Sequence, residues 1–213
     1  MKISYSVLLF ILVVLLITVG CAHNKTIDGF NANEWFEMGR QASIDNRSDK
    51  ALDAFNKAIE LDLKVAKTYI NRGRIYYYLG NYNQAIADYN KVVELDPEDT
   101  ETYINRGNSY NSLGNYNQAI ADYDKAMELN PKNTHTYVNR GDAYLKLGNY
   151  KQAFTNYDKA IELNAEFALA YYNRGLAYRA FGNNNQAIAY WKIAASLGLK
   201  EAQDYLKQKG IIW

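Results

Sequence analysis

The sequence has few of the residues that break helices or build covalent and metal sites. Of its 213 residues, two are proline and two are histidine. Because proline interrupts helices, its scarcity beside abundant alanine, leucine, glutamate and lysine favours an all-helical protein. A single cysteine, Cys21, excludes an internal disulfide. Lys and Arg number 24 against 23 for Asp and Glu, so no overall attraction to nucleic acid or to an anionic membrane surface is expected.

Residue patterns of catalysis are also missing from the sequence. It has no Ser/His/Asp set at a suitable spacing, no phosphate-binding glycine loop and no cluster of metal-ligand residues. His23 lies close to the N-terminus, and His135 is isolated in a helical segment, where a lone histidine is usually a surface hydrogen-bonding residue. We therefore expect a protein that is not an enzyme and that needs no cofactor.

The N-terminal segment has the features of a secretory signal. Lys2 precedes an apolar run of 13 residues, Val7 to Val19, which is shorter than the ~20 residues of a membrane span and typical of a signal-peptide core. The stretch "ITVGC" resembles a bacterial lipobox, in which the cysteine is lipidated and becomes the mature N-terminus, although Thr18 stands where leucine is usual. We expect a signal peptide over 1–20, lipidation of Cys21 and a tether over 21–31.

The lipoprotein resemblance also implies a location. Acyl chains on Cys21 would hold the protein firmly on a membrane. Ala22 is not the aspartate that often retains lipoproteins at an inner membrane, so the expectation is the cell envelope, on the outer membrane facing the periplasm. The alternative is an uncleaved N-terminal membrane anchor with an incidental cysteine.

The rest of the chain is a 34-residue repeat that needs no gaps. We number the blocks as repeats 1 to 5: 32–65, 66–99, 100–133, 134–167 and 168–201. Position 8 is always glycine: Gly39, Gly73, Gly107, Gly141 and Gly175. Position 4 is aromatic, position 20 is alanine, and position 24 is aromatic, in every repeat. Five copies in phase make this the dominant feature of the sequence.

Each repeat has two apolar series at helical spacing, one at positions 4, 8 and 11 and one at positions 20, 24 and 27–28. Between them stands a turn, "LGNY" in repeats 2, 3 and 4, where glycine ends one helix. Small residues at positions 8, 20 and 27 let the two helices approach closely, and the aromatic rings fill the remaining space. One such hairpin cannot bury its apolar face alone, so the hairpins are expected to stack. Residues 202–213 are expected to form a C-terminal capping helix, over 202–209, and a tail.

The pattern resembles the tetratricopeptide repeat family, with its series of aromatic, Gly, Tyr, Ala, aromatic, Ala and Pro positions. The resemblance covers 32–201, and it implies an all-α, right-handed α-α superhelix, a solenoid of five helix-turn-helix repeats plus the capping helix. Repeat 1 is the weakest copy, with Ala42 in place of tyrosine and "DNRSD" at the turn.

In this family, positions 2, 5, 6, 9, 12 and 13 of the first helix line a concave groove. The asparagines at position 6 form a ladder of amides that could hold an extended peptide backbone, and the tyrosines at positions 5, 12 and 13 could anchor side chains. The alternatives are amides that are solvated or bridge helices and rings that pack on neighbouring helices. The candidate residues are Asn71, Asn105, Asn139, Asn173, Arg74, Tyr77, Tyr78, Asn108, Asp142, Tyr172 and Arg179.

Chaperone-binding members of the family use Lys, Asn and Arg at set groove positions to clamp two carboxylates. That pattern is not met, because position 5 is apolar or aromatic in every repeat and Asn105 stands where the clamp has arginine. We do not expect recognition of an acidic chaperone tail.

The arginines at position 7 are expected to stabilise the fold rather than bind a ligand. Arg72, Arg106, Arg140 and Arg174 lie at the flank of the packing face on a helical wheel. Position 23 offers a partner, since Asp88 and Asp122 accompany the first two, although Asn156 and Tyr190 break the correlation.

These inferences predict a non-enzymatic protein–protein interaction scaffold, anchored in the envelope through Cys21, that binds a peptide or protein segment in its groove. The partner is not identified by the sequence. The alternative is a self-associating structural component of an envelope assembly. It follows from the atypical repeat 1, where Trp35 and Phe36 lie near an uncovered end.

Overall fold

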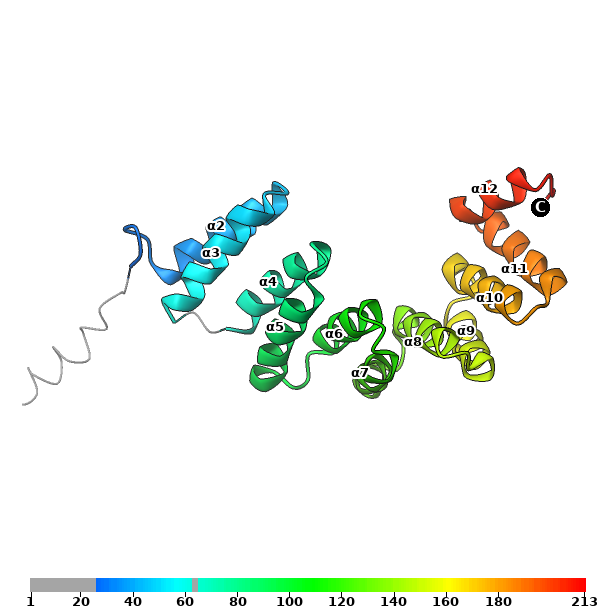
Figure 1. Ribbon diagram of the computed structural model, residues 1–213, viewed down its shortest axis with the longest axis horizontal. Helices are drawn as coiled ribbons and strands as arrows, with labels where there is room; N and C mark the ends of the chain where they lie inside the picture. Colours follow the sequence, from blue (N-terminus) through cyan, green and yellow to red (C-terminus); the bar gives the residue numbers. More distant parts are fainter. Residues whose placement is uncertain (1–25, 63–64) are drawn as a thin grey trace, which may run out of the picture. The chain divides into compact units, whose positions relative to one another are not determined.

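The structure, a computed structural model, describes residues 26–62 and 65–213. Apart from turns and an isolated bridge between Ile27 and Phe30, these residues form helices (Figure 1). In chain order they are α2 (Ala32–Ile44), α3 (Ser48–Glu60), α4 (Ala66–Tyr78), α5 (Tyr82–Leu95), α6 (Thr100–Ser112), α7 (Tyr116–Leu129), α8 (Thr134–Lys146), α9 (Tyr150–Leu163), α10 (Ala168–Ala180), α11 (Asn184–Ser196) and α12 (Lys200–Gln208). The prediction of an all-helical fold is confirmed. The predicted signal peptide and the lipidation site Cys21 lie outside the described residues.

The helices pack as consecutive helix-turn-helix pairs, one pair for each predicted repeat: α2 with α3, α4 with α5, α6 with α7, α8 with α9 and α10 with α11. The chain divides into two compact units, and the division falls between Lys64 and Val65. Unit 1 contains α2 and α3. In unit 2 the second helix of each pair packs on the first helix of the next, and α4, α6, α8 and α10 also contact one another in succession. Unit 2 is therefore a solenoid.

The turn inside each pair is closed by one residue in the left-handed conformation. Gly80 has φ +76°, and beyond it the Asn81 N–H donates to the Tyr76 carbonyl at 2.8 Å, which satisfies an open carbonyl at the helix end. In repeat 1 the equivalent residue is Asn46, with φ +57°. Asparagine tolerates this conformation better than most residues, so repeat 1 keeps its hairpin despite its divergent turn sequence.

The glycine at position 8 is required by the ring at position 24. A Cβ atom added to Gly107 would stand 2.7 Å from Cε1 of Tyr123, and in the other four pairs the nearest ring atom would be 2.5 to 2.9 Å away. Tyr123 itself is fully buried. The predicted close approach of the two helices is confirmed.

The C-terminal helix α12 packs on α11 through Ala202 and Leu206, which are both fully buried. They join a cluster with Trp191, Ala194 and Ala195 of α11. The predicted capping helix is confirmed, and it begins at Lys200 rather than at residue 202.

Candidate binding groove

The position-7 arginines hold the two helices of a repeat together. Arg72 donates from Nε and Nη2 to the two carboxylate oxygens of Asp88, at 2.9 and 2.5 Å. Arg106 forms the same two bonds with Asp122, at 2.8 and 2.6 Å. The hydrogen bonds with Asp122 raise the pKa of the Arg106 guanidinium, so this side chain stays positively charged. The predicted pairing with position 23 is confirmed for both.

The same arginines also reach the repeat before their own. Arg106 donates from Nη1 to Asn90 Oδ1 at 2.8 Å, and Arg140 and Arg174 form ion pairs with Asp124 and Asp158. All three acceptors stand at position 25, and this recurring polar position is the sequence signal of a contact that we did not predict. Arg174 has Tyr190 at position 23, and its guanidinium lies 4.5 Å from that ring centroid. The ladder of arginines is a structural device that links successive repeats.

A second ladder runs along the groove face of α6, α8 and α10. Asn108 Oδ1 accepts from the Tyr123 hydroxyl at 2.8 Å and from Asn139 Nδ2 of the next repeat at 3.0 Å. One side-chain oxygen at position 9 therefore accepts hydrogen bonds from a tyrosine of its own repeat and from an asparagine of the next repeat. We call this arrangement a rung.

The next rung has the same form, with a carboxylate as its acceptor. Asp142 Oδ1 accepts from the Tyr157 hydroxyl at 2.7 Å, and both of its oxygens lie 3.0 Å from Asn173 Nδ2. Burial raises the pKa of Asp142 to about 6, against the hydrogen bonds from Tyr157 and Asn173.

The rungs occupy part of the predicted amide ladder. The Nδ2 groups of Asn139 and Asn173 bridge helices, and the Oδ1 atom of each receives no side-chain hydrogen bond within residues 65–213. Peptide binding by these residues stays a prediction. Since their Nδ2 groups are already used, their Oδ1 atoms are the ones that could accept hydrogen bonds from a peptide. The sequence predicted only a core role for the tyrosines at position 24, and not that their hydroxyls donate hydrogen bonds to position 9. A pattern in the sequence indicates this contact: tyrosine at position 24 occurs with a polar residue at position 9. In repeat 5, where position 9 is the apolar Leu176, position 24 is Trp191.

The predicted groove residues of repeat 2 include exposed side chains. Asn71 is half-buried on α4, and Arg74 is exposed one turn later. The Tyr77 ring centroid lies 5.9 Å from that of Tyr78, whose surface is 78% exposed. Two buried polar atoms of α6 have no protein partner in the described residues, Nδ2 of Asn105 and Oδ1 of Asn111.

At the other end, Tyr172 and Arg179 both contact Trp191. The Tyr172 ring centroid is 6.4 Å from the indole, and its backbone carbonyl accepts from Trp191 Nε1 at 3.1 Å. The Arg179 guanidinium lies 5.4 Å from the indole centroid. Both residues therefore contribute to the packing of the last repeat.

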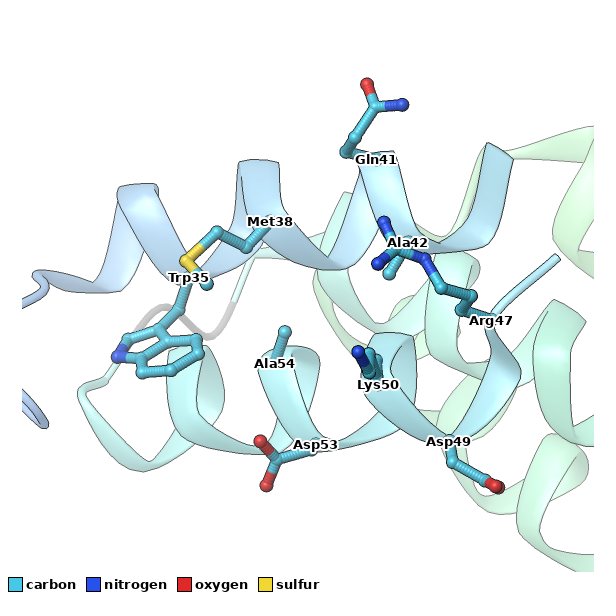
Figure 2. A pocket seen from close by; sticks show the side chains of 9 residues that line it. All are labelled: Trp35, Met38, Gln41, Ala42, Arg47, Asp49, Lys50, Asp53 and Ala54. Carbon is cyan, nitrogen blue, oxygen red and sulfur yellow. The ribbon is translucent and has the colours of Figure 1, made fainter. Parts of the chain in front are cut away.

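Unit 1 has a cavity of about 550 Å³ on its own surface (Figure 2). Its floor is apolar, and charged side chains of α3 and the preceding turn stand at its rim. The lining residues are Trp35, Met38, Gln41, Ala42, Arg47, Asp49, Lys50, Asp53 and Ala54. Met38 is 42% exposed and stands at position 7, which is arginine in repeats 2 to 5.

The described residues bring no three His, Cys, Asp or Glu side chains together in a way that could hold a metal ion. Among the helices over 26–62 and 65–213, none has the length and apolar character that crossing a membrane takes.

Comparison with known proteins agrees with the repeat pattern. A family model described as TPR repeat matches residues 107–148 and 141–182, and two models described as tetratricopeptide repeat match 66–99 and 88–121. No curated protein matches the sequence.

Solved structures resemble most of the chain. The crystal structure of the MamA protein is 27% identical, with a TM-score of 0.71 over 81% of this chain and 94% of that one. YrrB, a TPR protein with an unusual peptide-binding site, is 23% identical, with a TM-score of 0.67 over 83% and 92%. MamA from Desulfovibrio magneticus RS-1 is 17% identical, with a TM-score of 0.73 over 81% and 97%. The chain belongs to the tetratricopeptide repeat family, whose stacked helix pairs are scaffolds for protein–protein interaction and are generally not catalytic.

Proposed function

We propose that the groove face of α4, α6, α8 and α10 binds an extended segment of a partner protein. The observation that carries this proposal is Asn111 of α6, whose buried Oδ1 has no partner in the described residues. A buried acceptor without a donor is costly, and a backbone N–H of a bound segment would supply the donor once the side chains that cover Asn111 move aside. The exposed ring of Tyr78, with Tyr77 beside it, offers an aromatic anchor for a side chain of the same segment. The peptide-binding site of YrrB, a protein of similar fold, supports the same function.

Site-specific crosslinking in cells tests the groove. A photoreactive phenylalanine replaces Tyr78 in one variant and Ile193, a partly exposed residue of α11, in the control. We expect Tyr78 to yield adducts with a defined partner that are lost when Asn111→Ala is added, whereas Ile193 should yield none of them. Identical adducts from both positions would contradict binding in the groove.

We propose further that the scaffold is anchored in the bacterial cell envelope by lipid on Cys21, on the outer membrane facing the periplasm. The support is the sequence alone, since the chain's one cysteine stands two residues after the end of the apolar run. Metabolic labelling with a fatty acid should mark the wild type and not Cys21→Ser. If the wild type is itself unlabelled, keeps its apolar segment and stays in the membrane fraction after alkaline washing, the protein has an uncleaved membrane anchor instead.

One observation favours self-association as a second function. The cavity in unit 1 is apolar at Trp35 and Met38, and its rim carries Arg47 and Lys50 beside Asp49 and Asp53. A surface with both signs of charge can pair with a second copy of itself about a two-fold axis. Met38→Arg, which installs the residue of the other repeats, should convert a dimer to a monomer in sedimentation experiments. A wild-type chain that stays monomeric at high concentration excludes this function.

A further inference from the structure

The groove ladder is interrupted between α4 and α6. In the two complete rungs the acceptor stands 15 residues before its tyrosine and 31 residues before its asparagine, as with Asn108, Tyr123 and Asn139. The same register in repeat 2 places Arg74 at the acceptor position, with Tyr89 and Asn105 as the two donors. A guanidinium has five N–H donors and no acceptor. This rung therefore lacks the position-9 acceptor that serves the tyrosine and the asparagine in the complete rungs, and we call it the open rung.

The contacts of the open rung agree with this reading. Asn105 Nδ2 is buried and has no partner in the described residues, whereas the corresponding Nδ2 atoms of Asn139 and Asn173 each have one. No hydrogen bond from the Tyr89 hydroxyl occurs within residues 65–213, although Tyr123 and Tyr157 both donate one. Two donors that the repeat normally satisfies are left without an acceptor.

Arg74 adds a positive charge at the same place. It is exposed, and within residues 65–213 it forms no ion pair or hydrogen bond. Burial raises the pKa of the Tyr89 hydroxyl, and the nearby charge of Arg74 opposes that rise. The hydroxyl is therefore a neutral donor at pH 7. Since no contact fixes Arg74, its side chain can turn outward and open the way to Asn105.

We propose that the open rung binds a carboxylate of the partner polypeptide, held by Arg74, the Tyr89 hydroxyl and Asn105 Nδ2. The Asp142 rung shows what such a group does, because one of its carboxylate oxygens accepts from Tyr157 and Asn173 together. In repeat 2 the carboxylate would come from outside the chain and would gain a charge-assisted bond from Arg74. The proposal concerns one carboxylate, not the paired carboxylates of the chaperone clamp, and it rests on the proposed groove function.

The direct test follows the side-chain amide signals of Asn105 by NMR in the full chain. Three probes are titrated. N-acetylglutamate α-amide carries a side-chain carboxylate, N-acetylglycine carries a chain-terminal carboxylate, and N-acetylglutamine amide carries neither. We expect a saturable shift of the Asn105 signal with one or both acids and none with the neutral probe. The Asn139 amide signal, from a complete rung, is the internal control and should not move.

Arg74→Asn is the decisive variant, because it installs the residue that completes the rung in repeat 3. We expect it to weaken binding of the acidic probe by about tenfold or more, since it removes a charged hydrogen bond and supplies an internal acceptor. The same variant should raise the melting temperature by giving Asn105 a partner. If Arg74 only faced solvent, the substitution would leave the affinity for the acidic probe unchanged.

Three outcomes would overturn the proposal. They are an Asn105 signal that responds equally to the neutral probe, an Asn105 signal that responds to inorganic phosphate but to neither acid, and an Arg74→Asn chain that binds the acids as well as the wild type. Failure here leaves the groove function standing if the crosslinks from Tyr78 persist. If those crosslinks are absent while Asn105 responds to the acids, the site exists and the groove function is wrong.

Discussion

At the scale of single residues, position 9 determines how each pair of neighbouring repeats is joined in the groove. Asn108 and Asp142 complete their rungs as acceptors, whereas Arg74 leaves its rung open. The two complete rungs differ in charge. The asparagine side chain is uncharged at every pH. The carboxyl group of Asp142 is ionised at neutral pH, and holding that charge in a buried site costs free energy.

Because of this difference in charge, we expect the folding stability to depend on pH through Asp142. The pKa of Asp142 is raised from 3.8 to about 6 in the folded chain, so between these values the folded state binds more protons than the unfolded state. The contribution of Asp142 to stability is present below pH 3.8 and is lost as the pH rises through 6. Asp142→Asn should therefore match the wild type near pH 4 and exceed its stability by about 1 kcal/mol or more at pH 7.5, as measured by denaturant unfolding.

The mirror variant Asn108→Asp is the control for that measurement. It installs the carboxylate in the other complete rung, so it should lose stability as the pH rises from 4 to 7.5. If the stability difference between Asp142→Asn and the wild type does not change with pH, the assigned role of Asp142 is wrong.

A second residue-scale prediction concerns Arg106. Its side chain is 16% exposed and that of Asp122 is 8% exposed, so Arg106→Met leaves a buried carboxylate without its partner. We expect a loss of about 3 kcal/mol in unfolding free energy. Adding Asp122→Ala reproduces the Met38 and Ala54 of repeat 1 and should recover much of that loss. Arg106→Met with intact thermal stability but abolished partner binding would show that the arginine serves a ligand instead.

At the scale of helices, the hairpin depends on the contact of the position-8 glycine with the ring at position 24. Gly107→Ala places a Cβ atom 2.7 Å from the Tyr123 ring, and overpacking of this kind costs about 1–3 kcal/mol. Thermal unfolding should show the loss. Adding Tyr123→Leu makes room and should offset part of it. A Gly107→Ala chain as stable as the wild type would mean that α6 and α7 can separate without penalty.

The helices were predictable from the sequence, but much of the groove was not. The 34-residue repeat predicted the hairpins, the glycine contacts and the pairing of Arg72 with Asp88, because each of these features depends on residues within a single repeat. A helical wheel places Asn105 and Asn139 on the same face, and it cannot tell that only Asn139 has an acceptor. That difference depends on the residue 31 positions earlier, in another repeat, so it needed side-chain positions across the interface.

At the scale of the whole molecule, unit 2 is a stack in which each helix pair contacts its neighbours. Stability in such a solenoid is the sum of repeat and nearest-neighbour terms, so damage should stay local. The last repeat has no sixth repeat beside it in the described residues. Its outer side is covered by α12, through Leu206 packed near Trp191. The cap should therefore control the stability of α11 more than that of distant helices.

Leu206→Ala tests this locality. The side chain is fully buried, so its truncation should remove about 3 kcal/mol. Hydrogen exchange should show the greatest loss of protection in α11 and α12, a smaller loss in α10, and little change in α4 and α5. Lys207→Ala, an exposed change on the same helix, should leave exchange unaltered. An equal loss of protection from α4 to α12 would mean that unit 2 unfolds as one cooperative body, and the additive description of its repeats would fail.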